Sequence, residues 1–207
     1  SDTYAQYAET FLARAAQFSQ KPLAILDLRG NPGGNAMLSY AWSHSYAKQR
    51  ISGYGTRILR LPLHEEKFKQ LMDEETDQSL ASLLEDGNYQ KHDNLLYIEE
   101  PYMGKKLIEN KSMLLVLQDE TSASASEMLI DELHTMENVI FIGMPSAGAI
   151  SGSAMSTFYL DKSGLQIMFG NLYGDFPEAY ASEYEGISPD IWVQGKDVLK
   201  YVKELLN

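Results

Sequence analysis

Apolar residues form two kinds of pattern along this chain, a helical spacing and short continuous runs. In four segments they fall three and four positions apart, as on one face of an amphipathic helix. These predicted helices lie over 4–18, 36–42, 128–136 and 198–205. Short, nearly continuous apolar runs stand between them and are typical of strands buried on both faces of a parallel sheet. These predicted strands lie over 23–28, 113–117, 138–143 and 191–193. Because strands alternate with helices, the pattern predicts an α/β domain with a largely parallel sheet.

The segment from about 51 to 111 does not keep this pattern. It is acidic and mixed, with a strand-like stretch over 54–63, helical spacing over 65–85 and a short apolar run over 95–98. We expect an insertion that covers or borders a site, with a solvated surface lobe as the alternative. Further along, alternating apolar residues on both sides of the sequence DKSG predict a β-hairpin over 157–169.

The stretch 118–132, with the sequence QDETSASASEMLIDE, joins a predicted strand to a predicted helix. A serine at this corner lies near the helix N-terminus, where unpaired backbone N–H groups and the macrodipole favour developing negative charge. The position therefore suits a nucleophile. The alternative interpretation is helix capping by Thr121, Ser122 or Ser124, with Glu127 as the capping-box partner of Ser124.

The sequence RGNPGGN at 29–35 forms a second strand-to-helix corner. Its glycines permit positive φ and allow backbone N–H groups to point into an open site, which would suit an oxyanion hole or an anion-binding nest. The alternative is an ordinary glycine-rich turn. A phosphate loop is excluded, because neither GxxxxGK[ST] nor GxGxxG is present.

Composition narrows the classes of function. The length of 207 residues favours a single domain over 1–207, and a formal charge of −12 argues against nucleic acid and anionic membrane surfaces as partners. Cysteine is absent, which excludes disulfides, thiolate nucleophiles and cysteine zinc sites. No apolar run approaches the ~20 residues of a membrane span. The chain starts directly in a predicted helix without a signal-peptide pattern, so we expect a segment of a longer protein.

Four segments occur in an order that resembles the C-terminal processing peptidase family. They are LDLRGNPGG at 26–34, TSASASE at 121–127, IGMPSAG at 142–148 and EYEGISPD at 183–190. The family includes the tail-specific proteases, the tricorn core protease and the repeat of the interphotoreceptor retinoid-binding protein. The resemblance runs from Leu23 to Val193. It implies a crotonase-like (ClpP/crotonase) α/β core of ββα units, with the mixed insertion added.

The resemblance also implies roles for individual residues. Ser124, the middle serine of SASAS, would be the nucleophile that forms an acyl-enzyme with a peptide or protein substrate. The backbone N–H of Ala125 and that of Gly33 or Gly34 would form the oxyanion hole, worth about 3 kcal/mol per donor in the transition state. Glu183 falls where the Ser-His-Glu branch of the family has its glutamate, which supports a histidine base. No cofactor and no metal are implied.

The general base is missing from the expected positions. The Ser-Lys branch has a lysine and a glutamine where this chain has Ala149 and Ser153, and Lys162 lies in the predicted hairpin turn. In the Ser-His-Glu branch, the histidine comes from a segment N-terminal to the part of the family represented here. His134 is about 15 Å from Ser124 by helical rise, which is too far. The remaining histidines are expected at the surface; they are His44, His64 and His92. We therefore expect the base in an upstream domain missing from this chain.

Two other functions stay open at this point. A non-catalytic ligand- or peptide-binding domain on the same fold would explain the missing lysine, and aromatic residues would then line an apolar pocket. The aromatic candidates are Tyr40, Trp42, Tyr173 and Phe176. An acyl-CoA enzyme of the crotonase type is less favoured, because such enzymes do not need the serine corner. The family association favours an extracytoplasmic location.

Overall fold

A computed structural model of the chain describes residues 2–49, 51, 55–59, 89–92, 95–98, 107–160, 162–175, 183–195 and 197–206. The chain divides into two compact units. The first comprises Ser1–Ser52, Met103–Ile150 and Pro177–Asn207, and the second comprises Gly53–Tyr102 and Ser151–Phe176. The predicted helix over 65–85 lies outside the described residues. The insertion at about 51–111 therefore stays a prediction.

The first unit is built on a parallel sheet in which all paired strands run in the same direction. Its strands, in spatial order, are β1 (Leu23–Asp27), β5 (Met113–Gln118), β6 (Val139–Gly143) and β9 (Ile191–Trp192). All four predicted strands are thus confirmed, as is the parallel α/β class. Because the strands are parallel, β1, β5 and β6 end at the same edge of the sheet. The segments that follow them are therefore brought together there.

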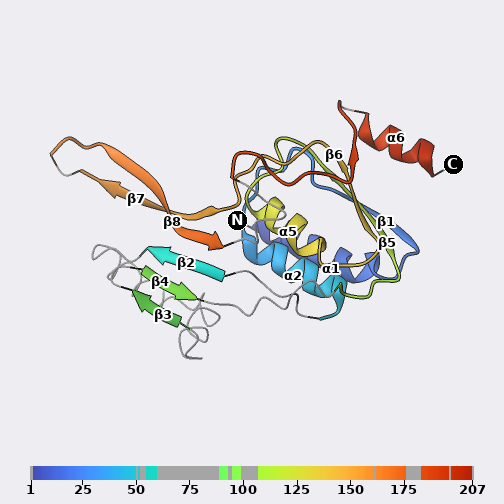
Figure 1. Cartoon of the computed structure of the whole chain (residues 1–207), viewed down its shortest axis with the longest axis horizontal. Helices are drawn as coiled ribbons and strands as arrows, with labels where there is room; N and C mark the ends of the chain where they lie inside the picture. Colours follow the sequence, from blue (N-terminus) through green and yellow to red (C-terminus); the bar gives the residue numbers. More distant parts are fainter. Residues whose placement is uncertain are drawn as a thin grey trace. The chain divides into compact units, whose positions relative to one another are not determined.

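Within the described residues, four helices accompany this sheet (Figure 1). They are α1 (Asp2–Phe18), α2 (Ala36–Ala47), α5 (Ala125–Leu133) and α6 (Val198–Leu205). One side chain of α6, Val202, is fully buried against Leu117 and Ile142 of the sheet. The helix predicted over 128–136 begins earlier, at Ala125, and ends at Leu133.

The helices α1 and α2 pack through aromatic side chains. Trp42 is fully buried and stacks on Phe11 and Tyr46 at ring-centroid distances of 5.8 and 5.3 Å. Phe18 meets the same indole edge to face at 6.1 Å. Trp42 is therefore part of the core, and it does not line a ligand pocket as the binding-domain interpretation supposed.

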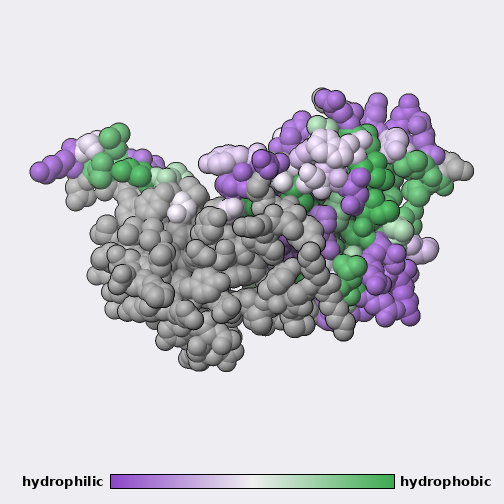
Figure 2. All heavy atoms as spheres, in the orientation of Figure 1, coloured by the Kyte–Doolittle hydropathy of each residue, from purple (hydrophilic) through white to green (hydrophobic). Residues whose placement is uncertain are grey.

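The second unit is an antiparallel sheet with the strand order β3-β4-β2-β8-β7. Its strands are β2 (Gly55–Leu59), β3 (Tyr89–His92), β4 (Leu95–Ile98), β7 (Gly152–Tyr159) and β8 (Gln166–Asp175). The predicted hairpin is confirmed as β7 and β8, although both strands are longer than predicted, and β3 was not predicted. Figure 2 shows apolar side chains at the hairpin tip, where Leu165 and Met168 are exposed.

No helix in the described part of the chain is long and apolar enough to span a membrane.

Candidate active site

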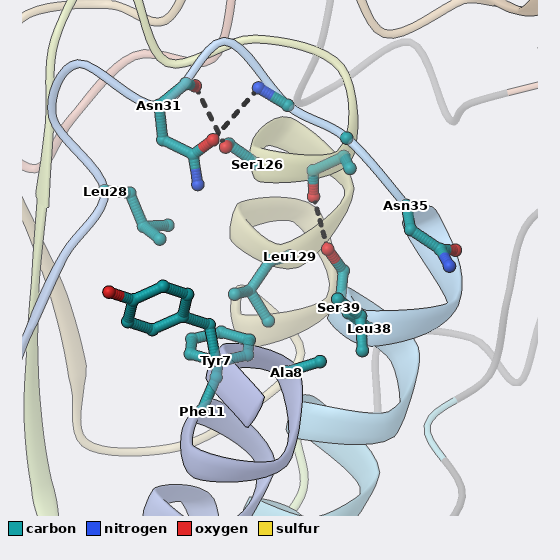
Figure 3. Close-up of a pocket in the computed structure, with 13 residues that line it drawn as sticks. Tyr7, Ala8, Phe11, Leu28, Asn31, Asn35, Leu38, Ser39, Ser126 and Leu129 are labelled. Atoms are coloured by element: carbon teal, nitrogen blue, oxygen red, sulfur yellow. Dashed lines mark hydrogen bonds between the residues drawn. The ribbon is translucent and has the colours of Figure 1, made fainter. Parts of the chain in front are cut away.

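The turn after β1 lies directly against the start of α5. The Gly30 N–H donates to the Asp119 carboxylate, with both oxygens at 3.1 Å. The Asn31 carbonyl oxygen accepts hydrogen bonds from the Ala123 N–H at 3.1 Å and from the Ser126 hydroxyl at 3.0 Å (Figure 3). The two corners that the sequence singled out therefore form one structure at the edge of the sheet.

Ser124 occupies a strained backbone position immediately before α5. Its φ is 53° and its ψ is −116°, a combination that residues with a Cβ rarely adopt. Such a position costs about 1–3 kcal/mol and is found mainly at functional sites. A sharp, strained strand-to-helix turn also exposes the nucleophilic serine of other hydrolases at the top of the sheet.

Helix capping does not account for this geometry. Ser124 and Glu127 have the capping-box arrangement, and the Glu127 carboxylate accepts the Ser124 N–H at 2.8 Å, as predicted. This capping box explains the hydrogen bonds at the corner, however, and not the backbone conformation of Ser124. An ordinary N-cap residue has an extended backbone and needs no strain.

Gly33 brings the glycine turn into contact with Ser124. Its φ is +100°, and a Cβ built on it would lie 2.7 Å from the Ala123 carbonyl oxygen and 2.8 Å from the Ser124 Cβ. A side chain at this position is therefore excluded by contact as well as by conformation. The Gly33 backbone consequently lies beside the serine, and Gly34 follows it directly in the chain.

Two backbone N–H groups next to Ser124 are available to a ligand. The Gly33 N–H donates to the Asn31 Oδ1 at 3.1 Å. By contrast, the N–H groups of Gly34 and Ala125 donate to no residue that the structure describes. Ala125 is the first residue of α5 and Gly34 is exposed, so both N–H groups can donate to an oxygen of a bound molecule, and a helix N-terminus favours an anionic one. Of the two glycines named from the sequence, Gly34 is the better donor.

Glu127 connects Ser124 to the loop that follows β6. Its carboxylate is fully buried and accepts four hydrogen bonds. Oε2 accepts the N–H groups of Ser124 at 2.8 Å and Ala149 at 2.9 Å. Oε1 accepts the Ser146 hydroxyl at 2.6 Å and the Gly148 N–H at 2.7 Å. The residue at the lysine position of the Ser-Lys branch, Ala149, thus contributes its backbone to this network.

The segment around Glu183 packs on the same loop. The Tyr184 N–H donates to the Gly148 carbonyl oxygen at 2.8 Å, and the Ile187 N–H donates to the Ser146 hydroxyl at 2.7 Å. Glu183 is exposed and directly precedes Tyr184. The structure therefore brings the fourth sequence motif to the loop bound by Glu127. The catalytic role of Glu183 stays a prediction.

Two histidines occupy structural positions. His44 on α2 was expected at the surface, but its side chain is only one-third exposed, and its Nε2 lies 3.8 Å from the Glu132 carboxylate. Glu132 follows Ser124 by eight residues, about 12 Å along a helix. His134 stacks on Phe141 with a ring-centroid distance of 3.8 Å, and burial lowers its pKa to about 4. Neither arrangement is that of a base for Ser124.

The other candidate bases add no partner for Ser124. Lys162 is exposed beside the β7–β8 turn, as predicted. His92 belongs to β3 in the second unit, and His64 lies outside the described residues. Among the residues that the structure describes, no group of three or more His, Asp or Glu side chains is placed to hold a metal ion.

Sequence reasoning missed two polar residues that support the site from the end of β5. Gln118 is fully buried, and its Nε2 donates to the carbonyl oxygens of Met144 and Ile187 at 3.1 and 2.7 Å. Burial raises the pKa of Asp119, but hydrogen bonds from Thr121 and Gly30 outweigh this effect and hold the pKa below its usual value. In the sequence, the change from the apolar run 113–117 to the polar residues QDE at 118–120 could have indicated these two residues.

Comparison with known proteins gives the family of this chain and solved structures with a similar fold. Residues 2–193 match peptidase family S41. Similar solved structures include mature CPAF complexed with lactacystin, with a TM-score of 0.60, 15% identity, and coverage of 96% of this chain and 46% of that one. A putative peptidase from Parabacteroides merdae has a TM-score of 0.56 and 17% identity, with coverage of 96% of this chain and 56% of that one. The photosystem II D1 C-terminal processing protease has a TM-score of 0.51 and 18% identity, with coverage of 94% of this chain and 40% of that one. This chain therefore spans about half of each structure. No curated protein sequence gives a significant match.

Proposed function

Because the chain belongs to peptidase family S41, we propose that it is the catalytic domain of a serine endopeptidase that cleaves peptide or protein substrates through an acyl-enzyme at Ser124. The observation that carries this proposal is the strained backbone of Ser124 beside two N–H groups without a described partner. Strain of this kind is retained where it serves a function.

The proposed reaction follows from these positions. The Ser124 Oγ attacks the carbonyl carbon of the scissile bond, and its proton passes to a general base. The carbonyl oxygen becomes an oxyanion that accepts hydrogen bonds from the Ala125 and Gly34 N–H groups. Collapse of the intermediate breaks the C–N bond, and the base returns the proton to the leaving amine. Water then hydrolyses the acyl-enzyme and regenerates Ser124.

Glu127 holds the nucleophile in place in this proposal. It fixes the backbone N–H of Ser124 and does not touch the reacting atoms, so we treat it as a positioning residue. We assign the general base to a histidine outside these 207 residues, supported by Glu183 as in the Ser-His-Glu branch that the motifs resemble. This assignment fits the structural roles of His44 and His134. The family resemblance also leads us to propose an extracytoplasmic location.

Active-site labelling tests the proposed function. An alkyl fluorophosphonate, applied to the protein that carries this domain, should modify Ser124, and peptide mapping by mass spectrometry should locate the adduct there. The Ser124→Ala variant should remain unlabelled, whereas Ser163→Ala, which changes an exposed serine of the second unit, should be labelled like the wild type. Equal labelling of Ser124→Ala would refute the nucleophile. A folded, unlabelled wild type that binds peptides without cleaving them would favour the non-catalytic binding domain.

A further inference from the structure

Gln118 is a fully buried polar residue at the end of an apolar strand. Residues 113–117 of β5 are all apolar, and the Gln118 side chain is buried with them. Its Nε2 donates to the carbonyl oxygens of Met144 and Ile187 at 3.1 and 2.7 Å, but its Oε1 has no hydrogen-bond partner among the residues that the structure describes. A buried acceptor without a partner is unfavourable. This indicates that the two hydrogen bonds from Nε2 have a role other than core packing.

These two hydrogen bonds join segments that are far apart in the chain. Met144 and Ile187 lie 26 and 69 residues after Gln118. The segments also pair with each other, because the Ser146 N–H donates to the Ile187 carbonyl oxygen at 3.1 Å and the Ile187 N–H donates to the Ser146 hydroxyl at 2.7 Å. A Cβ on Gly186 would overlap the Ser146 carbonyl oxygen, so the two backbones are in direct contact. Gln118 therefore fastens both segments to the end of β5.

The second of these segments contains a strained turn beside Glu183. Tyr184 has a φ of 72°, which bulky residues rarely adopt, and its side chain is 89% exposed. Strain of this kind persists only where the surrounding structure imposes it. Because the Tyr184 side chain is in solvent, backbone contacts must do so. The Tyr184 N–H donates to the Gly148 carbonyl oxygen at 2.8 Å, and the Ile187 carbonyl oxygen is held by Gln118.

The strained turn is connected to Ser124 through Glu127. The Glu127 carboxylate accepts the N–H groups of Ser124 and Gly148 at 2.8 and 2.7 Å, and the Gly148 carbonyl oxygen accepts the Tyr184 N–H. Ser124 and Tyr184, both with positive φ, are thus the two ends of one hydrogen-bonded chain. Glu183 directly precedes Tyr184. The position of Glu183 relative to Ser124 therefore depends on how firmly the turn is held.

We propose that Gln118 is a positioning residue for Glu183, because its side chain fastens the strained turn to the sheet and so fixes Glu183 relative to Ser124. The inference rests on the proposed function, in which Glu183 supports a histidine base. It adds a residue that lies outside the four segments that resemble the peptidase family. Gln118 is buried and bonds to backbone carbonyl groups, so it acts on the reaction only through the turn.

The rate and pH dependence of fluorophosphonate labelling test this role in the protein that carries this domain. Gln118→Leu removes both N–H donors, and the displaced Glu183 should slow labelling of Ser124 at least about tenfold. A carboxylate beside a histidine favours the charged imidazole, so its displacement should also move the half-maximal labelling rate to lower pH by about half a unit or more. An unchanged rate would overturn the proposal. A slower rate without the pH shift would indicate a merely structural role and would also overturn it.

Gln166→Leu is the matched control, because it makes the same change at an exposed position of β8. It should leave the labelling rate within about twofold of the wild type and the pH profile unchanged.

A double substitution shows whether Gln118 acts through Glu183. In a Glu183→Gln background, Gln118→Leu should slow labelling by no more than about twofold, because the carboxylate that Gln118 positions is already absent. A loss of about tenfold in both backgrounds would contradict the inference. If Gln118→Leu does not fold, Gln118→Met, which has a side chain of similar length without a donor, replaces it in both experiments.

Amide hydrogen exchange separates the two proposals. The amides of Tyr184 and Ile187 should exchange at least about tenfold faster in Gln118→Leu than in the wild type. If wild-type Ser124 is labelled while these exchange rates and the labelling rate do not change in Gln118→Leu, the positioning role fails and the peptidase proposal stands. If the wild type stays unlabelled while the two amides exchange faster in Gln118→Leu, the peptidase proposal fails and the hold of Gln118 on the turn stands.

Discussion

Replacing Glu127 by Gln keeps the shape of the side chain but turns one of its two acceptor oxygens into an NH₂ donor. In the native structure each oxygen accepts two hydrogen bonds, from Ser124 and Ala149 on one side and from Ser146 and Gly148 on the other. Whichever way the new amide is oriented, its NH₂ group therefore faces two donors.

The less costly orientation places the NH₂ group toward Ser146, because a hydroxyl can rotate to accept a hydrogen bond. The Gly148 N–H cannot do so, and a buried donor without a partner costs about 1–3 kcal/mol. The two bonds that remain also lose the carboxylate charge, and charge-assisted hydrogen bonds are about twice as strong as neutral ones. We therefore expect Glu127→Gln to lower the free energy of unfolding by about 2–4 kcal/mol.

Urea unfolding and the labelling rate of Ser124 measure this effect. Because Glu127 holds the Ser124 backbone, we also expect fluorophosphonate labelling to slow by about tenfold or more, since small displacements of a reacting group are costly. Glu120→Gln is the matched control, because Glu120 is exposed in the same segment. If Glu127→Gln and Glu120→Gln unfold and react alike, the positioning role of Glu127 is wrong.

Three further substitutions test other parts of the site. Ser124→Gly should be more stable than Ser124→Ala in urea by about 1–2 kcal/mol, because glycine removes the strain at φ 53°; equal stability would argue against strain. Gly33→Ala should lower the free energy of unfolding by at least about 2 kcal/mol and abolish labelling of Ser124, since the new Cβ would lie 2.7 Å from the Ala123 carbonyl oxygen. Gly30→Ala is the control, because Gly30 also has a positive φ but has open space around it, and it should lower the free energy of unfolding by only about 1 kcal/mol. Burial raises the pKa of Asp131 on α5 to about 6, above its value of 3.8 in the unfolded chain. The folded protein therefore favours the neutral carboxyl group, and the contribution of Asp131 to the free energy of unfolding is fully present below pH 3.8 and is lost as the pH rises through about 6. Asp131→Asn should therefore gain about 2 kcal/mol near neutral pH and almost nothing below about pH 4, and a gain independent of pH would contradict this reasoning.

The sequence predicted the parallel sheet because its apolar runs are local features. The strands β1, β5 and β6 each carry an uninterrupted run of the length of a buried strand. The prediction was less accurate at helix ends, where side-chain hydrogen bonds decide the boundary. The helix α5 ends at Leu133, and the Thr135 hydroxyl then binds the Glu132 carbonyl oxygen at 2.6 Å.

The network around the serine corner could be predicted only in part. A capping-box spacing indicated the Glu127 contact to Ser124, because both residues lie on one helical turn. Its contacts to Ser146 and Gly148 join segments 19 and 21 residues apart, and only the parallel pairing of β5 with β6 brings these segments together. The unusual φ of Ser124 left no local signal, since serine is common before helices in ordinary conformations.

The most direct test of the central claim is the site of fluorophosphonate modification in the protein that carries this domain. The account predicts one major adduct, on Ser124, which is absent from Ser124→Ala and unchanged in Ser163→Ala. An adduct on another residue, or labelling of Ser124→Ala at the wild-type rate, would show that the strained serine is not the nucleophile.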